Sequence, residues 1–336
     1  MTYRLATLFF CLLALSTCRN DFSLEGDFVD MPVVYAYLDA ESERHFVRVE
    51  RAFLEVGANA LDNAANPDVI YYGPDEATVR LVNASTEESV VLDRVNGQDF
   101  GFDREDGIFA TEPNILYTIE DAEFNLRPGQ RVRVEIERPG EPLASAEAIL
   151  LQEMSVIRPV DRIALDNYDR DVVVAWRTDE NAQAFAVRAL FNIREINLSD
   201  PSATRDIQLT YPMIDYFNPG SGDRNNNTIS YDASAEGFFV FLGDNLEPTD
   251  EFRRRLQSID FQIIAAGQAV VDRQVLTNAN AGITSSQALP RFSNIDGGIG
   301  LFTSTTSVIQ TGIQITDASR DSLRDGQYTR ELNFLF

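Results

Sequence analysis

Apolar and polar residues alternate with a period of two along much of the chain, a pattern typical of half-buried β-strands. The clearest case is 131–137, where Val and Ile alternate with Arg and Glu. Two turn signals, Pro128-Gly129 and Pro139-Gly140, stand on either side of it. This segment is therefore predicted to be an amphipathic strand that ends at two tight turns.

The first half of the chain contains several such strands at near-regular spacing. Residues 31–54 predict a hairpin, and 77–84 and 88–95 predict another. Residues 58–73 are rich in Ala and Asn and predict a short helical turn followed by a loop. Short strands separated by turns favour a β-sandwich, so we expect an N-terminal Ig-like or transthyretin-like sandwich over 31–152.

The second half, 153–336, predicts a further β-rich domain. The only tryptophan, Trp176, lies in an apolar run at 171–178 that predicts a buried strand. Residues 182–198 fit either its hairpin partner or an Ala-rich helix, and we favour the strand. Residues 236–245 and 261–276 also predict strands, and 293–315 predicts a Gly-rich turn followed by two strands.

One helix is expected in this second domain, at 247–260. Thr249 or Asp250 can cap its start, and Arg253 to Arg255 follow where positive charge favours the helix dipole. The predicted fold class is therefore mainly β, with two β-sandwich domains and one short helix in the second.

The N-terminus predicts a signal peptide over 1–17. Its apolar run, 5–15, is shorter than the roughly 20 residues that span a bilayer. Leu15 to Cys18 resemble a bacterial lipobox, although Thr17 stands where Gly, Ala or Ser is usual. The resemblance implies a lipidated Cys18, followed by an acidic tether over 18–30. The alternative is an ordinary secretory signal with a chance cysteine.

Composition excludes several kinds of chemistry. The formal net charge is −25, and all 28 basic residues are Arg, so Lys Schiff-base chemistry is excluded. Strong negative charge argues against nucleic acid as a partner, because phosphates need cationic contacts. The two cysteines, Cys11 and Cys18, both lie in the predicted leader and lipobox, and no cofactor is expected.

Few residues suggest a catalytic or metal site. His45, the only histidine, lies in a predicted strand and is interpreted as a partly exposed strand residue. The "DGGIG" segment at 296–300 is interpreted as a turn that needs positive φ, not a phosphate loop, because a strand follows it. A weak calcium candidate is formed by four oxygen-bearing residues, against the alternative of a solvated turn: Asp166, Asn167, Asp169 and Asp171.

Aromatic residues beside two polar loops are candidate ligand contacts. Tyr71 and Tyr72 border the loop at 58–76, and Tyr216 and Phe217 border the loop at 217–227. Exposed rings at these positions would suit stacking against a sugar. The alternative is that they are core residues at strand ends.

Three segments resemble an uncharacterised family of outer-membrane lipoproteins from Gram-negative, Bacteroidetes-type bacteria. They are 31–72, 107–120 and 292–304, including "MPVVYAYLDAESERHFVRVERAFL" and "FSNIDGGIGLFTS". The resemblance implies β-sandwich domains held at the outer membrane, on either its periplasmic or its surface face. It implies no catalytic residues.

The function expected from these observations is a non-enzymatic binding or assembly role, with an envelope protein or a glycan as the partner. Two alternatives stay open. One is a glycan hydrolase that uses paired carboxylates, such as those of the acidic loops at 39–43 and 103–107. The other is a passive structural component of the cell envelope.

The lipobox interpretation makes a direct prediction. Cys18→Ala removes the thiol that would carry the acyl chains, each buried CH₂ of which contributes about 0.8 kcal/mol. We expect the variant to leave the membrane fraction, measured by fractionation and immunoblotting of the native host. Cys11→Ala is the matched control and should stay in the membrane. Equal retention of both variants would contradict lipidation at Cys18.

Overall fold

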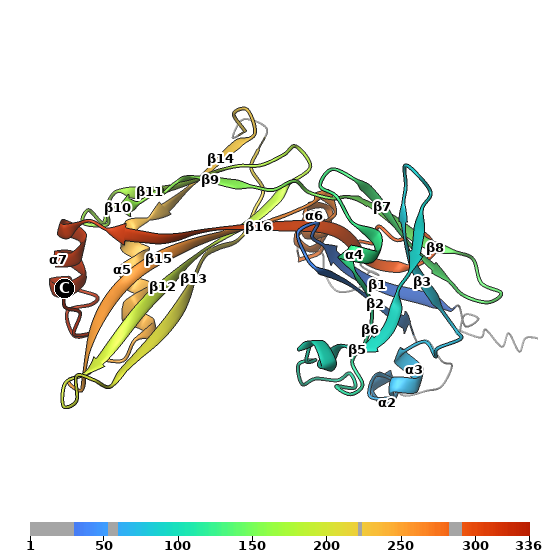
Figure 1. Cartoon of the computed structure of the whole chain (residues 1–336), viewed down its shortest axis with the longest axis horizontal. Helices are drawn as coiled ribbons and strands as arrows, with labels where there is room; N and C mark the ends of the chain where they lie inside the picture. The colour runs from blue at the N-terminus through green and yellow to red at the C-terminus, as the bar shows by residue number, and fades with distance from the viewer. Residues whose placement is uncertain (1–29, 53–59, 221–223, 282–290) are drawn as a thin grey trace, which may run out of the picture.

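The computed structural model describes residues 30–52, 60–220, 224–281 and 291–336. The chain is mainly β, as the sequence predicts. Figure 1 shows two lobes joined by one long strand, β16 (Ile299–Ile315). The predicted signal peptide, Cys18 and all but the last residue of the tether lie outside the described residues.

The N-terminal lobe is a sandwich of two antiparallel layers, with the first half of β16 added in parallel to one of them. Short helices lie in the connections that the structure describes. The first layer contains β1 (Met31–Leu38), β2 (Arg44–Ala52), β6 (Ile115–Glu120) and β5 (Asp93–Asn96). The second contains β4 (Ser89–Val91), β3 (Thr78–Asn83), β7 (Arg131–Glu137) and β8 (Ala144–Ile149). The helices are α2 (Ala60–Ala64), α3 (Pro67–Ile70), η1 (Gly97–Phe100) and α4 (Asp121–Phe124).

The core of this lobe confirms the alternation in the sequence. Val132, Val134 and Ile136 of β7 are fully buried, and they belong to one apolar cluster with Val34 of β1 and Val47 of β2. The two predicted hairpins also form, as β1–β2 and β3–β4.

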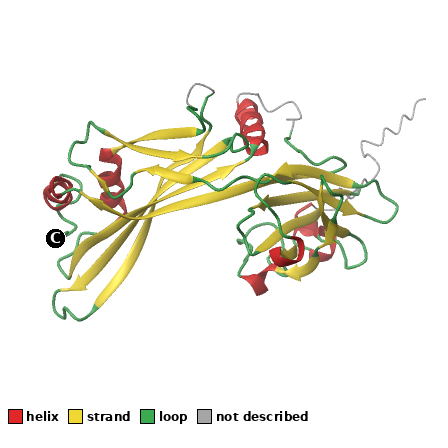
Figure 2. Cartoon of the chain, turned by 45° about the horizontal axis from the view of Figure 1, so that its top comes forward, coloured by secondary structure: helices red, strands yellow, loops and turns green. Residues whose placement is uncertain are grey.

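The C-terminal lobe packs four long strands against a smaller sheet and helices (Figure 2). Its large sheet contains β13 (Thr204–Phe217), β12 (Ala184–Asn197), β15 (Phe252–Ala266) and the second half of β16, which also pairs with β10 (Arg162–Ile163). Its small sheet contains β14 (Thr228–Ser234), β11 (Asp171–Arg177) and β9 (Ser155–Arg158). Its helices are α5 (Ala235–Asn245), α6 (Gln268–Ala281) and α7 (Asp317–Asp325).

The helix predicted at 247–260 is wrong, because most of this segment is strand β15. Its alternate residues, including Arg254 and Leu256, point inward with the period of a strand. The buried Arg254 donates from Nε to Oε1 of Glu195 on β12, 2.9 Å away. A cross-strand ion pair therefore overrides the local capping signal.

The strand predicted at 236–245 is also wrong, because this segment is helix α5. Ser234 caps the helix by accepting a hydrogen bond from the Gly237 N–H. Phe238, Phe239 and Leu242 are buried on one helical face. Helix α6 likewise replaces the end of the strand predicted at 261–276.

The strand at 182–198 is confirmed, but its predicted hairpin with 171–178 is wrong. β11 pairs with β9 and β14, whereas β12 pairs with β13 and β15. The two strands lie in different sheets and meet across the core, where the ring centroids of Trp176 and Phe185 are 5.3 Å apart.

Strand β16 crosses from one lobe to the other as a single element, where the sequence predicts two strands. Its residues 299–304 pair in parallel with β1, and 305–313 pair antiparallel with β15. Phe302 and Ile295 belong to the apolar core of the N-terminal lobe. The predicted domain boundary, between residues 152 and 153, therefore assigns Ile295 and Phe302 to the C-terminal domain, although both pack in the core of the N-terminal lobe.

Gly300 is required where β16 meets β1. Its φ is +130°, and a Cβ built there would lie 1.9 Å from the carbonyl oxygen of Val34. Gly297, in the turn before it, has φ of +68°, so the turn predicted for "DGGIG" is confirmed.

We predict that Gly300→Ala destabilises the protein by about 3 kcal/mol or more, because the new methyl group meets backbone that cannot move aside. Urea unfolding followed by circular dichroism, which reports on the strands of both lobes, measures the change. Gly107→Ala is the control, since its Cβ would meet nothing within 4 Å. If the two variants unfold alike, the close approach of β16 to β1 is incorrect.

Candidate binding face

Tyr71 and Tyr72 are both buried, which matches the core alternative for these residues. The Tyr71 hydroxyl accepts a hydrogen bond from Arg104 Nη1 at 2.9 Å, and the Tyr72 hydroxyl donates to Asp30 Oδ1 at 2.8 Å. Burial raises the pKa of Tyr72, and the hydrogen bond to the Asp30 carboxylate raises it further. Neither ring is free to stack against a sugar in this arrangement.

Tyr216 and Phe217 are half-buried at the end of β13, in the other lobe. The Phe217 ring centroid lies 6.5 Å from that of Trp176 and 6.0 Å from that of Tyr231. The structure therefore does not bring the two predicted aromatic pairs together. Part of the loop at 217–227 lies outside the described residues.

The calcium candidate is an exposed turn. Asp166, Asn167, Asp169 and Asp171 all face solvent, and Asn167 Oδ1 accepts a hydrogen bond from the Asp169 N–H at 3.0 Å. Within the described residues, no group of three or more His, Cys, Asp or Glu is placed to hold a metal ion. The solvated-turn alternative describes this loop.

His45 is buried, contrary to the interpretation as a partly exposed strand residue. It is in phase with Val47 and Val49 on the inner face of β2. Its Nε2 lies 3.0 Å from Oδ1 of Asp121, which also accepts the Leu126 N–H at 2.8 Å. This pair ties β2 to helix α4 and the turn after it.

The outer face of β1 and β2 carries an exposed group of aromatic rings. Tyr35 and Tyr37 point outward because they alternate with the buried residues of β1. Phe46 points outward from β2, and Phe100 and Phe102 reach over it from η1 and the loop that follows. We call these five residues the aromatic face.

The three phenylalanine rings of the aromatic face contact one another through Phe46. The Phe46 ring centroid lies 4.7 Å from that of Phe102 and 5.6 Å from that of Phe100, both edge to face. The Arg44 guanidinium carbon lies 5.1 Å from the Phe100 ring centroid. Tyr35, Tyr37, Phe46 and Phe102 line an open hollow of about 470 Å³.

The arginines beside the aromatic face are paired with neighbouring glutamates. Arg44 pairs with Glu120 across β2 and β6. Glu50 accepts from Arg48 at 3.1 Å and from Arg104 at 3.0 Å. These three arginines and two glutamates leave a formal charge of +1 beside the rings, on a chain whose net charge is −25.

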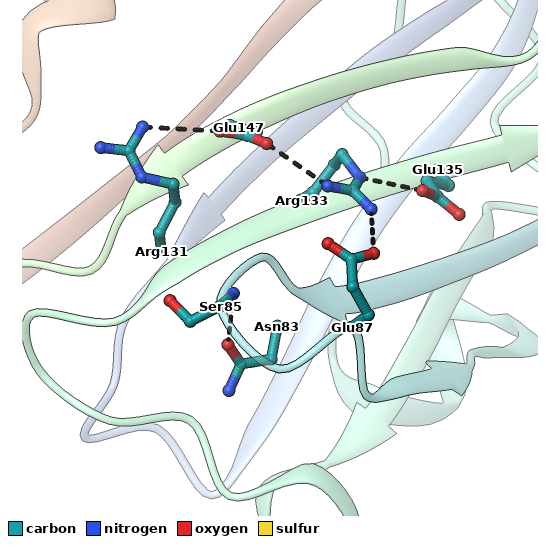
Figure 3. Close-up of polar contacts among 7 residues, drawn as sticks. All are labelled: Asn83, Ser85, Glu87, Arg131, Arg133, Glu135 and Glu147. Carbon is teal, nitrogen blue, oxygen red and sulfur yellow. Dashed lines mark hydrogen bonds and ion pairs between the residues drawn. The ribbon is translucent and has the colours of Figure 1, made fainter.

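The second sheet of this lobe presents a different surface (Figure 3). Arg133 on β7 contacts Glu87 at 2.8 Å, Glu135 at 2.9 Å and Glu147 at 3.4 Å. The hydrogen bonds that Arg133 donates to Glu87 and Glu135 raise the pKa of Arg133. Alternating charges on exposed strands form a solvated surface that contributes little to stability, so this face is not the candidate site.

Sequence reasoning could have found only half of the aromatic face. The phase of Tyr35 and Tyr37 against Val34 and Leu38 already places both rings outward. Phe100 and Phe102 lie more than 50 residues after Phe46 in the chain. The periodicity of a single strand gives no information about contacts over that separation. Only the fold shows that they cover the same strand.

No family model and no curated protein matches this chain. Among solved structures, a 1.5-MDa bacterial ice-binding adhesin is 9% identical, with 87% of this chain and 66% of the adhesin chain covered and a TM-score of 0.18. A DUF4785 family protein from Legionella pneumophila is 11% identical, with 69% of this chain and 50% of that chain covered, also at a TM-score of 0.18. Within the described residues, no helix is long and apolar enough to cross a membrane.

Tyrosine nitration tests which rings are accessible. We predict rapid nitration of Tyr35 and Tyr37, which are 37% and 49% exposed, and slow nitration of Tyr71 and Tyr72, which are 3% and 1% exposed. The raised pKa of Tyr72 slows it further, because the phenolate is the reacting form. Peptide mass spectrometry gives the rates, and the urea-unfolded chain should react at all four. Fast nitration of Tyr71 or Tyr72 in the folded chain would contradict their burial.

Proposed function

We propose that this chain is a lipid-anchored cell-envelope protein with a non-enzymatic binding role, and that it binds a protein partner through the aromatic face. The observation that carries the proposal is the exposure of several large apolar rings on one surface. Phe100 and Phe102 are 39% and 45% exposed, beside Tyr35 and Tyr37. Grouped apolar side chains on a protein surface are typical of interaction sites.

The composition of the face favours a protein over a glycan. Tyr, Phe and Arg are enriched at protein interfaces, and binding energy concentrates in such aromatic anchors. Glu120 contacts Arg44, and Glu50 contacts both Arg48 and Arg104, so a partner that docks there buries no arginine without a carboxylate beside it. A glycan that stacks on Tyr35 and Tyr37 is the second candidate.

The path of the chain supports an anchor at the outer end of the N-terminal lobe. Strand β1 runs parallel to the first half of β16, and β16 then continues into the C-terminal lobe. The chain therefore enters β1 at the end far from the C-terminal lobe. A lipid on Cys18 would leave the C-terminal lobe pointing away from the membrane.

The entry point of the chain is held firmly. Buried Arg138 donates from Nη1 to the carbonyl oxygen of Asp30 at 2.6 Å, and Tyr72 binds the Asp30 carboxylate. Arg51 Nε lies 3.5 Å from the same carboxylate. These contacts fix the first described residue, which is the point where the proposed tether would join the fold. The outer-membrane location rests on the lipobox and on the family resemblance.

Matched variants test the proposed face in mild-detergent co-purification from native membranes. Tyr37→Ser/Phe102→Ser should reduce recovery of a stoichiometric partner by about tenfold or more, because it removes two anchor rings. The control is Val91→Ser/Leu143→Ser, two residues that are 53% exposed at the end of β4 and 49% exposed just before β8. This control should retain the partner.

Two outcomes oppose the proposal. Equal loss of the partner in both double variants would rule out the aromatic face as its site. If wild type recovers no partner but binds glycans in an array, and Tyr37→Ser/Phe102→Ser abolishes that binding, the ligand is a glycan. Circular dichroism of both double variants shows that the fold is retained.

A further inference from the structure

Charged residues on the inner face of the C-terminal sheet alternate in sign across three strands. In the aligned register, Glu195 of β12 lies between Arg205 of β13 and Arg254 of β15. Arg205 Nε donates to Glu195 Oε2 at 2.7 Å, and Arg254 Nε donates to Glu195 Oε1 at 2.9 Å. Each charge therefore faces a neighbour of opposite sign, and the two guanidiniums lower the pKa of Glu195 although burial opposes this.

The next row, on the outer face, breaks this alternation. Arg194 of β12 lies between Asp206 of β13 and Arg255 of β15. Asp206 binds Arg194 through two hydrogen bonds of 2.7 and 2.8 Å. Arg255, on the other side of Arg194, forms no ion pair within the described residues. Like charges directly opposite each other on neighbouring strands are destabilising.

Arg194 and Arg255 line a hollow of about 500 Å³ with a third arginine. Arg320 of α7 reaches the same hollow, where its guanidinium carbon lies 5.6 Å from the Phe336 ring centroid. Arg320 is paired with Asp317 at 3.0 Å. Two of the three arginines are thus neutralised by aspartates, and Arg255 supplies the one uncompensated positive charge.

We infer that this hollow binds a carboxylate-bearing ligand through Arg255. One uncompensated guanidinium matches a single negative charge, and its planar fork matches the two oxygens of a carboxylate. Such an anion would supply Arg255 with the negative partner that Asp206 supplies to Arg194. Ile196 and Phe336 also line the hollow and offer apolar contact to the body of the ligand.

The inference is independent of the proposed protein partner, because the hollow lies in the other lobe from the aromatic face. The inference is tested with three probes, phenylacetate, glucuronate and inorganic phosphate, at constant ionic strength. Isothermal titration calorimetry measures the binding of each probe to the full chain. Phenylacetate represents a free organic acid, and glucuronate represents the acidic sugar of a glycan. The neutral analogue 2-phenylethanol measures apolar binding alone.

We expect at least one carboxylate to bind and Arg255→Gln to weaken it by about tenfold or more, since charge-assisted hydrogen bonds are lost. Arg253→Gln is the matched control. Arg253 lies on the same strand with its side chain also exposed, but outside the hollow, so its variant should bind as wild type does. The stronger of the two carboxylates identifies the source of the ligand.

A second measurement does not depend on the ligand. Arg255 faces Arg194 across the strands and has no ion-pair partner within the described residues, so its charge should not stabilise the fold. We therefore expect Arg255→Gln to be at least as stable to urea as Arg253→Gln at low salt. Two binding results would overturn the inference: carboxylate binding that Arg255→Gln leaves unchanged, or no binding of either carboxylate, whether or not phosphate binds. Marked destabilisation by Arg255→Gln would also overturn it, since Arg255 would then be a structural residue.

Discussion

The arrangement of both lobes depends on one strand that serves two sheets. β16 gives its first half to the N-terminal lobe and its second half to the C-terminal lobe. The change occurs at Ser304 and Thr305, where hydrogen bonds join distant segments. Ser304 Oγ donates to the Leu38 carbonyl and accepts the Leu151 N–H, both at 2.9 Å. Thr305 Oγ1 donates to the Ala265 carbonyl at 2.8 Å. The two apolar cores are therefore separate, but β16 runs unbroken between them. At the crossing point it is hydrogen-bonded to segments of both lobes.

Local patterns predicted the parts of the fold in which a strand buries one face and exposes the other. Val132, Val134 and Ile136 show this most clearly, because their burial depends only on alternation. The same reasoning failed at 247–260, where Thr249 imitates a helix cap and the arginines that follow imitate the positive charge that favours a helix dipole. The deciding contact there is Arg254 with Glu195, 59 positions earlier. Such a pair leaves no signal in a local window.

The candidate site was less predictable than the fold, for a related reason. A tyrosine beside a polar loop looks exposed in sequence, yet Tyr71 and Tyr72 are buried because Arg104 and Asp30 satisfy their hydroxyls. Whether a ring with a polar tip is buried depends on partners brought by the fold. Tyr35 and Tyr37 could be placed outward by phase alone, but the phenylalanines that complete their surface arrive from another segment.

The two proposed surfaces differ in how the sheet balances its charges. Where an arginine meets a glutamate on the next strand, as with Arg44 and Glu120, the charge is cancelled and the neighbouring rings are left to dominate the surface. Where an arginine meets an arginine, as at Arg194 and Arg255, the sheet keeps a positive charge that nothing on the neighbouring strand cancels. Strand register thus makes one surface suited to an apolar partner and the other to an anion. Each property follows from which residues face each other across strands, and the overall charge of −25 gives no indication of either.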